Sequence, residues 1–184
     1  SITVSNVAAP TLTSATYDAS TGALVITGAN LAAYAGAAND IDVSKLTLTG
    51  EGGNTYTLTS DDVELTSSTE FSITLNATDR LQLAGLFNKT GGSSGGGTTY
   101  NIAAAEDWAP GAEASTDIAD LTGNAITVAN VAAPILTGAG YDASTGALTV
   151  TGTNLPAYPG ATNDIDISKL TLTGEGGNTY TLTS

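Results

Sequence analysis

The sequence lacks cysteine, methionine and histidine. Without cysteine the chain has no disulfide bond, no thiolate nucleophile and no zinc site of the cysteine/histidine type. Without histidine it lacks the commonest general base near neutral pH and the commonest transition-metal ligand. Aromatic residues make up only 5% of the chain, too few to line the deep cleft that a carboxylate-based glycosidase needs. We therefore expect a protein that is not an enzyme.

Basic residues are also scarce. The chain has 4 Lys and Arg against 18 Asp and Glu, which gives a net charge of −14. Nucleic acids and anionic membranes both attract basic surfaces, so neither is an expected partner. No apolar run approaches the roughly 20 residues that span a bilayer, which predicts no membrane insertion. The sequence has no basic segment followed by an apolar core, which is the pattern of a signal peptide. A mature secreted segment and an internal fragment would both lack this pattern.

What the chain has instead is threonine, serine, alanine and 22 glycines, with only 12% charged residues. This composition is typical of an extended extracellular β-protein rather than a cytosolic enzyme. It predicts a secreted protein that is extracellular or lies at the cell surface.

A long internal repeat dominates the sequence. The string GEGGNTYTLTS occupies residues 50–60 and returns at residues 174–184. Aligned at an offset of 124, residues 2–60 and 126–184 are identical at 48 of 59 positions. Solenoid repeats are about 20–50 residues long, so a repeat of this length has the size of a whole domain.

The string NVAAP at residues 6–10 and 130–134 marks the expected domain junctions. Residues 1–9 would be the last strand of a preceding repeat and a linker. Residues 10–131 would be one complete repeat, and residues 132–184 the first, incomplete part of the next. Two alternatives remain open: the chain is a piece of a longer tandem array, or half-domains of neighbouring chains complete each other in a filament.

Apolar and polar residues alternate with period two in the segments KLTLTG, TYTLT, EFSITLN and ITVANV. Threonine at the polar positions suits the solvent face of a strand. Turn signals such as DASTG and GEGGN separate these segments. The pattern predicts an all-β antiparallel sandwich of seven or eight short strands. One short helix is expected within residues 76–89, with Asn76 or Thr78 as its N-cap.

The string APTLTSATYDASTGALVITGANL, with its near copy at residues 133–155, resembles the start of bacterial immunoglobulin-like and IPT/TIG-like repeats. The strings TYNIAAAEDW and DIADLTGNAITV resemble tandem repeats of very large secreted, RTX-adhesin-like β-strand-repeat surface proteins. The resemblance implies an immunoglobulin-like β-sandwich repeat, in tandem, in a stalk, adhesin or matrix fibre. Members of such families often bind calcium, which stiffens the junctions between repeats.

Acidic and amide side chains cluster in four short segments, NDID, its copy, EDW and DIADLTGN. Calcium takes six to eight oxygen ligands, and carboxylates this close repel one another unless a cation lies between them. The clusters predict a Ca²⁺ site with ligands among Asn39, Asp40, Asp42, Asp107, Asp117, Asp120, Asn124, Asp164 and Asp166. None of them has EF-hand spacing. The alternative is that these residues cap turns or lie in solvated acidic loops.

Repetition of a whole domain gains length, valency or stiffness. The sequence therefore predicts a structural repeat of a secreted bacterial fibre, stalk or surface and matrix protein, rigidified by calcium. The expected partners are neighbouring repeats or other copies of the chain. The alternative is an adhesive module in which each repeat binds a glycan or a protein ligand, as in biofilm adhesins.

Overall fold

The computed structural model describes residues 2–36, 39–112 and 116–183, and is mostly β. Residues 10–131, the first repeat, hold a curled mixed sheet of seven strands with the order β4-β3-β6-β7-β1-β2-β5. The elements of this repeat are β1 (Thr11–Asp18), β2 (Ala23–Ala29), η1 (Val43–Lys45), β3 (Leu46–Thr49), η2 (Glu51–Gly53), β4 (Thr55–Thr57), β5 (Glu70–Thr74), α1 (Ala77–Leu86), β6 (Asn101–Ala104) and β7 (Ala125–Ala129).

The sheet differs in one pairing from the antiparallel arrangement predicted above. Strands β1 and β7 run parallel, with Ser14 opposite Ala125, whereas the other neighbours in the sheet are antiparallel. A parallel pair needs a long crossover connection, and the rest of the repeat provides it. Strands β6 and β7 share a single residue pair, Asn101 with Ala125, so the sheet is only narrowly continuous there.

The alternating pattern places every second side chain of the strands in one core. Leu24 and Ile26 of β2 are fully buried, as are Leu46 and Leu48 of β3. Trp108 is also fully buried, and its indole N–H donates a hydrogen bond of 2.8 Å to the carbonyl oxygen of Ile118. The buried core residues all lie between Leu12 and Val128.

The predicted helix is confirmed. Helix α1 begins after Asn76, whose side-chain oxygen accepts the backbone N–H of Asp79 at 2.8 Å and so caps the first turn. Asp79 is itself buried and accepts hydrogen bonds from Tyr56, Thr59 and Ser60. This network ties the start of α1 to β4 and to the segment that follows it.

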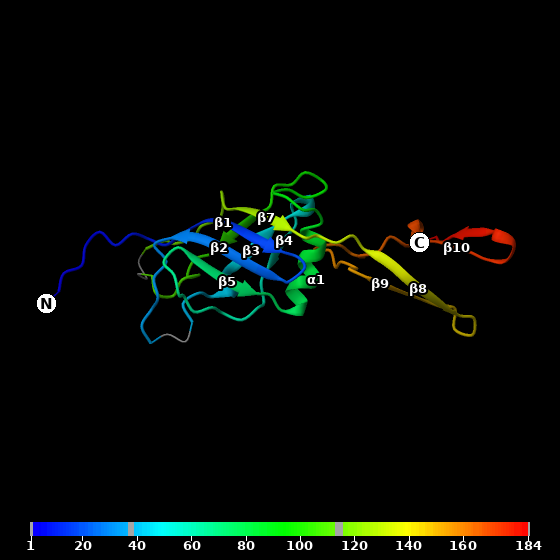
Figure 1. Cartoon of the computed structure of the whole chain (residues 1–184), viewed down its shortest axis with the longest axis horizontal. Helices are drawn as coiled ribbons and strands as arrows, with labels where there is room; N and C mark the ends of the chain where they lie inside the picture. The colour runs from blue at the N-terminus through cyan, green and yellow to red at the C-terminus, as the bar shows by residue number, and fades with distance from the viewer. Residues whose placement is uncertain (1, 37–38, 113–115, 184) are drawn as a thin grey trace.

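Residues 132–183, in the second repeat, form two separate hairpins beyond the α1 end of the sheet, while the N-terminal residues extend from the opposite end (Figure 1). The elements are β8 (Ile135–Asp142), β9 (Ala147–Thr153), η3 (Ile167–Lys169), β10 (Thr171–Thr173), η4 (Glu175–Gly177) and β11 (Thr179–Thr181). The β8–β9 register repeats that of β1–β2, including the irregularity after the second residue. Tyr141 is 67% exposed, whereas its counterpart Tyr17 is 3% exposed.

Candidate functional site: the junction between the repeats

The linker between the repeats is fixed by hydrogen bonds on both sides. The side-chain amide of Asn130 donates to the Asp18 carboxylate at 3.1 Å, and the N–H of Val131 donates to the Thr90 hydroxyl at 3.3 Å. On the other side, the Asn154 amide donates to the carbonyl oxygen of Ala133 at 3.3 Å. The linker therefore has partners in the first repeat and in the second.

Beyond the linker, residues 155–160 of the second repeat, the Tyr158 loop, lie against α1 and η2 of the first repeat. The N–H of Ala157 donates to the carbonyl oxygen of Leu81 in α1 at 3.3 Å. The hydroxyl of Tyr158 donates to the carbonyl oxygen of Glu51 at 3.0 Å and accepts from the Asn54 amide at 3.1 Å. Pro159 is buried. The loop is thus docked through both its backbone and its tyrosine.

Glycines on the first repeat make room for this loop. A Cβ atom at Gly85, in α1, would clash with the carbonyl oxygen of Ala157 and would lie 2.9 Å from the Cα atom of Tyr158. A Cβ atom at Gly52, in η2, would lie 3.0 Å from the Tyr158 hydroxyl. Glycine is unfavourable inside a helix, so its presence at position 85 is explained by the close approach of the docked backbone.

An aspartate sets the shape of the loop. The Asp164 carboxylate accepts the N–H of Tyr158 at 2.6 Å. In the first repeat Asp40 accepts the N–H of Tyr34 at the same distance, and its second oxygen accepts the N–H of Leu65 at 2.9 Å. Asp40 and Asp164 were predicted as calcium ligands, and the structure places both as anchors of a tyrosine-bearing loop.

Two further predicted ligands cap short 3-10 helices. Asp42 precedes η1 and accepts the N–H and hydroxyl of Ser44, and Asp166 precedes η3 and does the same with Ser168. The hydrogen bonds from Ser168 hold the pKa of Asp166 below its usual value. In these two positions the structure shows the capping role that was the alternative to metal binding.

Asp120 and Asn124 are brought together, as their shared segment predicted, but they bind each other. The Asn124 amide donates to one oxygen of Asp120 at 2.8 Å, and the N–H of Leu12 donates to the other at 2.9 Å. Asp117 accepts the N–H of Ala119 at 3.0 Å, and Glu106 accepts the same N–H at 3.0 Å.

Asn39 and Asp107 are exposed. Over residues 2–36, 39–112 and 116–183, no group of three or more acidic, histidine or cysteine side chains is placed to hold a metal ion. The Ca²⁺ site therefore stays a prediction.

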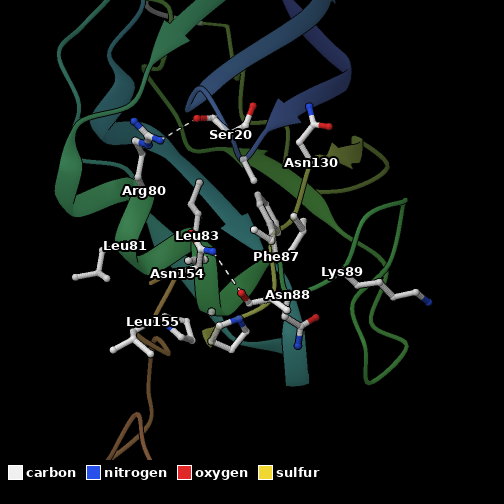
Figure 2. A pocket seen from close by; sticks show the side chains of 18 of the residues that line it. Ser20, Arg80, Leu81, Leu83, Phe87, Asn88, Lys89, Asn130, Asn154 and Leu155 are labelled. Atoms are coloured by element: carbon white, nitrogen blue, oxygen red, sulfur yellow. Dashed lines mark hydrogen bonds between the residues drawn. The ribbon is translucent and has the colours of Figure 1, made fainter. Parts of the chain in front are cut away.

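A cleft of about 1000 Å³ lies beside the docked loop, lined by α1 residues and by the linker. Figure 2 shows Arg80 turned toward Ser20, whose carbonyl oxygen it binds at 3.2 Å, and Lys89 extending outward. In the first repeat the equivalent linker, residues 6–10, borders a cavity of about 290 Å³ that is also lined by Asn30, Ala32 and Ala109.

Comparison with known proteins gives no family model, no curated protein and no solved structure that matches this chain. Within the described residues, no helix has the length and apolar character needed to cross a membrane.

The sequence did not indicate Glu51, Asn54, Leu81 or Gly85 as functional residues. A signal was nevertheless present in the comparison of the two copies. Ala32 and Ala35 become Pro156 and Pro159, on either side of the tyrosine that both copies share, and these changes mark the loop that docks.

Proposed function

We propose that this protein is a structural repeat of a secreted bacterial fibre, stalk or surface and matrix protein. One observation carries the proposal: the Tyr158 loop of the second repeat is docked on α1 and η2 of the first by hydrogen bonds from Ala157, Asn54 and Tyr158 itself. Such a contact fixes the direction in which one repeat follows another. Repeated along a chain, it produces a stiff rod rather than a flexible string of domains.

Within this proposal each repeat is an immunoglobulin-like sandwich. The single residue pair between β6 and β7 divides the sheet into the strands β4-β3-β6 and β7-β1-β2-β5, and the core residues come from both groups. The hairpins of the second repeat carry apolar side chains such as Leu136 and Tyr141 that are exposed here. Strands equivalent to β5, β6 and β7 would cover these side chains and complete a second sandwich.

Calcium is the second element of the proposal. Glu106 and Asp117 both accept the N–H of Ala119, which brings two carboxylates to one turn where a cation would relieve their repulsion. If Ca²⁺ binds only the folded state, it raises the melting temperature of the chain, and the rise grows with the concentration of free Ca²⁺. A melting curve recorded with Ca²⁺ that coincides with one recorded in excess chelator would remove calcium from the proposal.

The docked junction can be tested in the full chain by a distance measurement. Because the chain has no cysteine, spin labels attach only to cysteines introduced for the purpose. Ser72 in β5 and Gly140 in β8 are exposed, and a Cβ atom at Gly140 meets nothing within 4 Å. We expect one narrow distribution of distances between labels at these two positions.

Tyr158→Phe should broaden this distribution, because phenylalanine keeps the ring but loses the hydrogen bonds to Glu51 and Asn54. Tyr34→Phe is the matched control, since the Tyr34 hydroxyl has no hydrogen bond within the described residues and should leave the distribution unchanged. A broad distribution in the unmodified chain, or equal broadening by the two variants, would contradict the docked junction and with it the proposed function.

A further inference from the structure

The loop that docks in the second repeat has a counterpart in the first. Residues 31–36, the Tyr34 loop, have the same aspartate anchor, because Asp40 holds the N–H of Tyr34 as Asp164 holds that of Tyr158. The Tyr34 side chain is nevertheless 57% exposed. Its hydroxyl has no partner among the residues that the structure describes. The backbone of Tyr34 is therefore anchored within its own repeat, without a contact to another one.

The surface that receives the loop is also present twice. In the first repeat the Asn54 amide donates to the carbonyl oxygen of Glu51 at 3.0 Å, and this bond holds it toward Tyr158. In the second repeat the Asn178 amide donates to the carbonyl oxygen of Glu175 at the same distance. Asn178 has no tyrosine partner in the described part of the chain. Tyr158 and Asn54 thus bind each other, whereas Tyr34 and Asn178 each lack such a partner within the described residues.

We infer that the Tyr34 loop is a docking surface for a preceding repeat of the same kind, and that it binds the face formed there by α1 and η2. This inference rests on the proposed function and names the partner of a second surface. The contact is the one already formed inside the chain by the Tyr158 loop. Tyr34 would donate to the carbonyl oxygen of the partner's glutamate and accept from its asparagine.

The chemistry of the contact suits partners that are both acidic. The net charge of −14 means that two repeats repel each other at long range. The docked contact uses carbonyl, amide and hydroxyl groups. The carboxylate of Glu51 is held elsewhere, by the Asn88 amide at 2.8 Å and the N–H of Gly96 at 2.8 Å. Only the backbone oxygen of Glu51 meets the tyrosine, so the Glu51 carboxylate takes no part in this contact.

The two loops differ in their prolines. Pro156 and Pro159 restrict the undocked Tyr158 loop, whereas Ala32 and Ala35 leave the Tyr34 loop more conformational freedom. Each proline at a compatible position favours the ordered form by about two- to fivefold in the equilibrium constant. The Tyr34 loop should therefore dock through the same bonds but with a smaller docking equilibrium constant.

A single repeat can serve as the unit of the test. The seven strands of the sheet and helix α1 lie between Thr11 and Ala129, and the buried core lies between Leu12 and Val128. Residues 8–131 therefore contain a complete core and should fold alone. Joining two copies of residues 8–131 preserves the offset of 124 between equivalent positions. In this duplicated protein, the Tyr34 loop of the second unit takes the position that the Tyr158 loop has in the natural chain.

Spin labels on cysteines at Ser72 of the first unit and at Thr16 of the second unit, both exposed positions, report the docking. We expect a narrow distance distribution. Tyr34→Phe in the second unit should broaden it, with a loss of about fivefold in the docking equilibrium for a hydrogen bond of average strength. Tyr34→Phe in the first unit should change nothing, because that loop has no preceding repeat in this protein.

Three outcomes would overturn the inference. In the first, the duplicated protein gives a broad distribution while the natural chain, labelled at Ser72 and Gly140, gives a narrow one. The Tyr34 loop then does not dock, although the proposed function stands. In the second, both distributions are broad, and then the docked junction and the proposed function fail together. Equal effects of Tyr34→Phe in the two units would also overturn the inference.

Discussion

The substitution Gly85→Ala tests the junction through a single methyl group. Gly85 lies in helix α1, and the three atoms nearest to a Cβ at this position all belong to Ala157 and Tyr158 of the second repeat. In an isolated helix, alanine is favoured over glycine by about 0.5–1 kcal/mol. In the full chain, the same methyl group would clash with the carbonyl oxygen of Ala157, so the loop has to leave.

The variant should therefore stabilise the single repeat but destabilise the docked junction. In residues 8–131 alone, we expect Gly85→Ala to raise the melting temperature by about 2–4 °C, the effect of 0.5–1 kcal/mol on a domain of this size. In the full chain it removes the hydrogen bonds of Ala157 and Tyr158, each of which contributes about 0.5–1.5 kcal/mol. This loss exceeds the gain in helix propensity, so the repeats should undock.

Thermal unfolding of residues 8–131 and the label distances in the full chain measure the two effects separately. Ala84→Gly is the matched control, because Ala84 is exposed on the same helix. It should lower the melting temperature of residues 8–131 by a similar amount and leave the label distances narrow. The reasoning would be refuted if Gly85→Ala left the distances narrow, or if it destabilised the single repeat.

Three further predictions follow from the fold. Burial raises the pKa of Asp79, but hydrogen bonds from Ser60, Thr59 and Tyr56 outweigh it, so the pKa is lowered. The ionised carboxylate therefore stabilises the fold at a pH above its unfolded pKa of about 3.9, and this stabilisation is lost as the pH falls through its pKa in the folded protein. The urea concentration needed for unfolding should decrease below about pH 4. Asp79→Asn should lower the free energy of unfolding at pH 7 by roughly 2–4 kcal/mol, because buried hydroxyl and N–H donors lose an acceptor. It should also weaken the dependence of stability on pH, and an unchanged urea midpoint would contradict this prediction. Trp108→Phe should lower the free energy of unfolding by about 1–3 kcal/mol, because the buried carbonyl oxygen of Ile118 loses its hydrogen-bond donor. A loss below about 0.5 kcal/mol, which is close to the uncertainty of such comparisons, would contradict this bond.

The sequence predicted those parts of the fold whose signals are local. The alternation in the segments KLTLTG and EFSITLN predicted β3 and β5, and the expected cap at Asn76 or Thr78 predicted where α1 begins. The parallel pairing of β1 with β7 could not be predicted in this way. Period-two alternation is the same for parallel and antiparallel edges, and it says which side chains face the core but not which strand lies alongside.

The junction was harder to predict because its main groups carry little sequence information. Leu81 and Glu51 contribute carbonyl oxygens, and Gly85 contributes the absence of a side chain. A backbone oxygen is present at every residue, so no pattern of residue types identifies it. Only the comparison of the two copies, in which prolines replace Ala32 and Ala35, pointed to this loop.

The acidic residues show why clustered carboxylates were ambiguous in this chain. With 18 acidic and 4 basic residues, few carboxylates can find a cationic side chain. Asp40, Asp120 and Asp164 instead accept backbone N–H groups and so fix loops next to strands. Backbone donors hold a carboxylate in place without adding a positive side chain. Neutral groups also join the two acidic repeats at the junction, so added salt should favour this contact by screening the repulsion between the repeats.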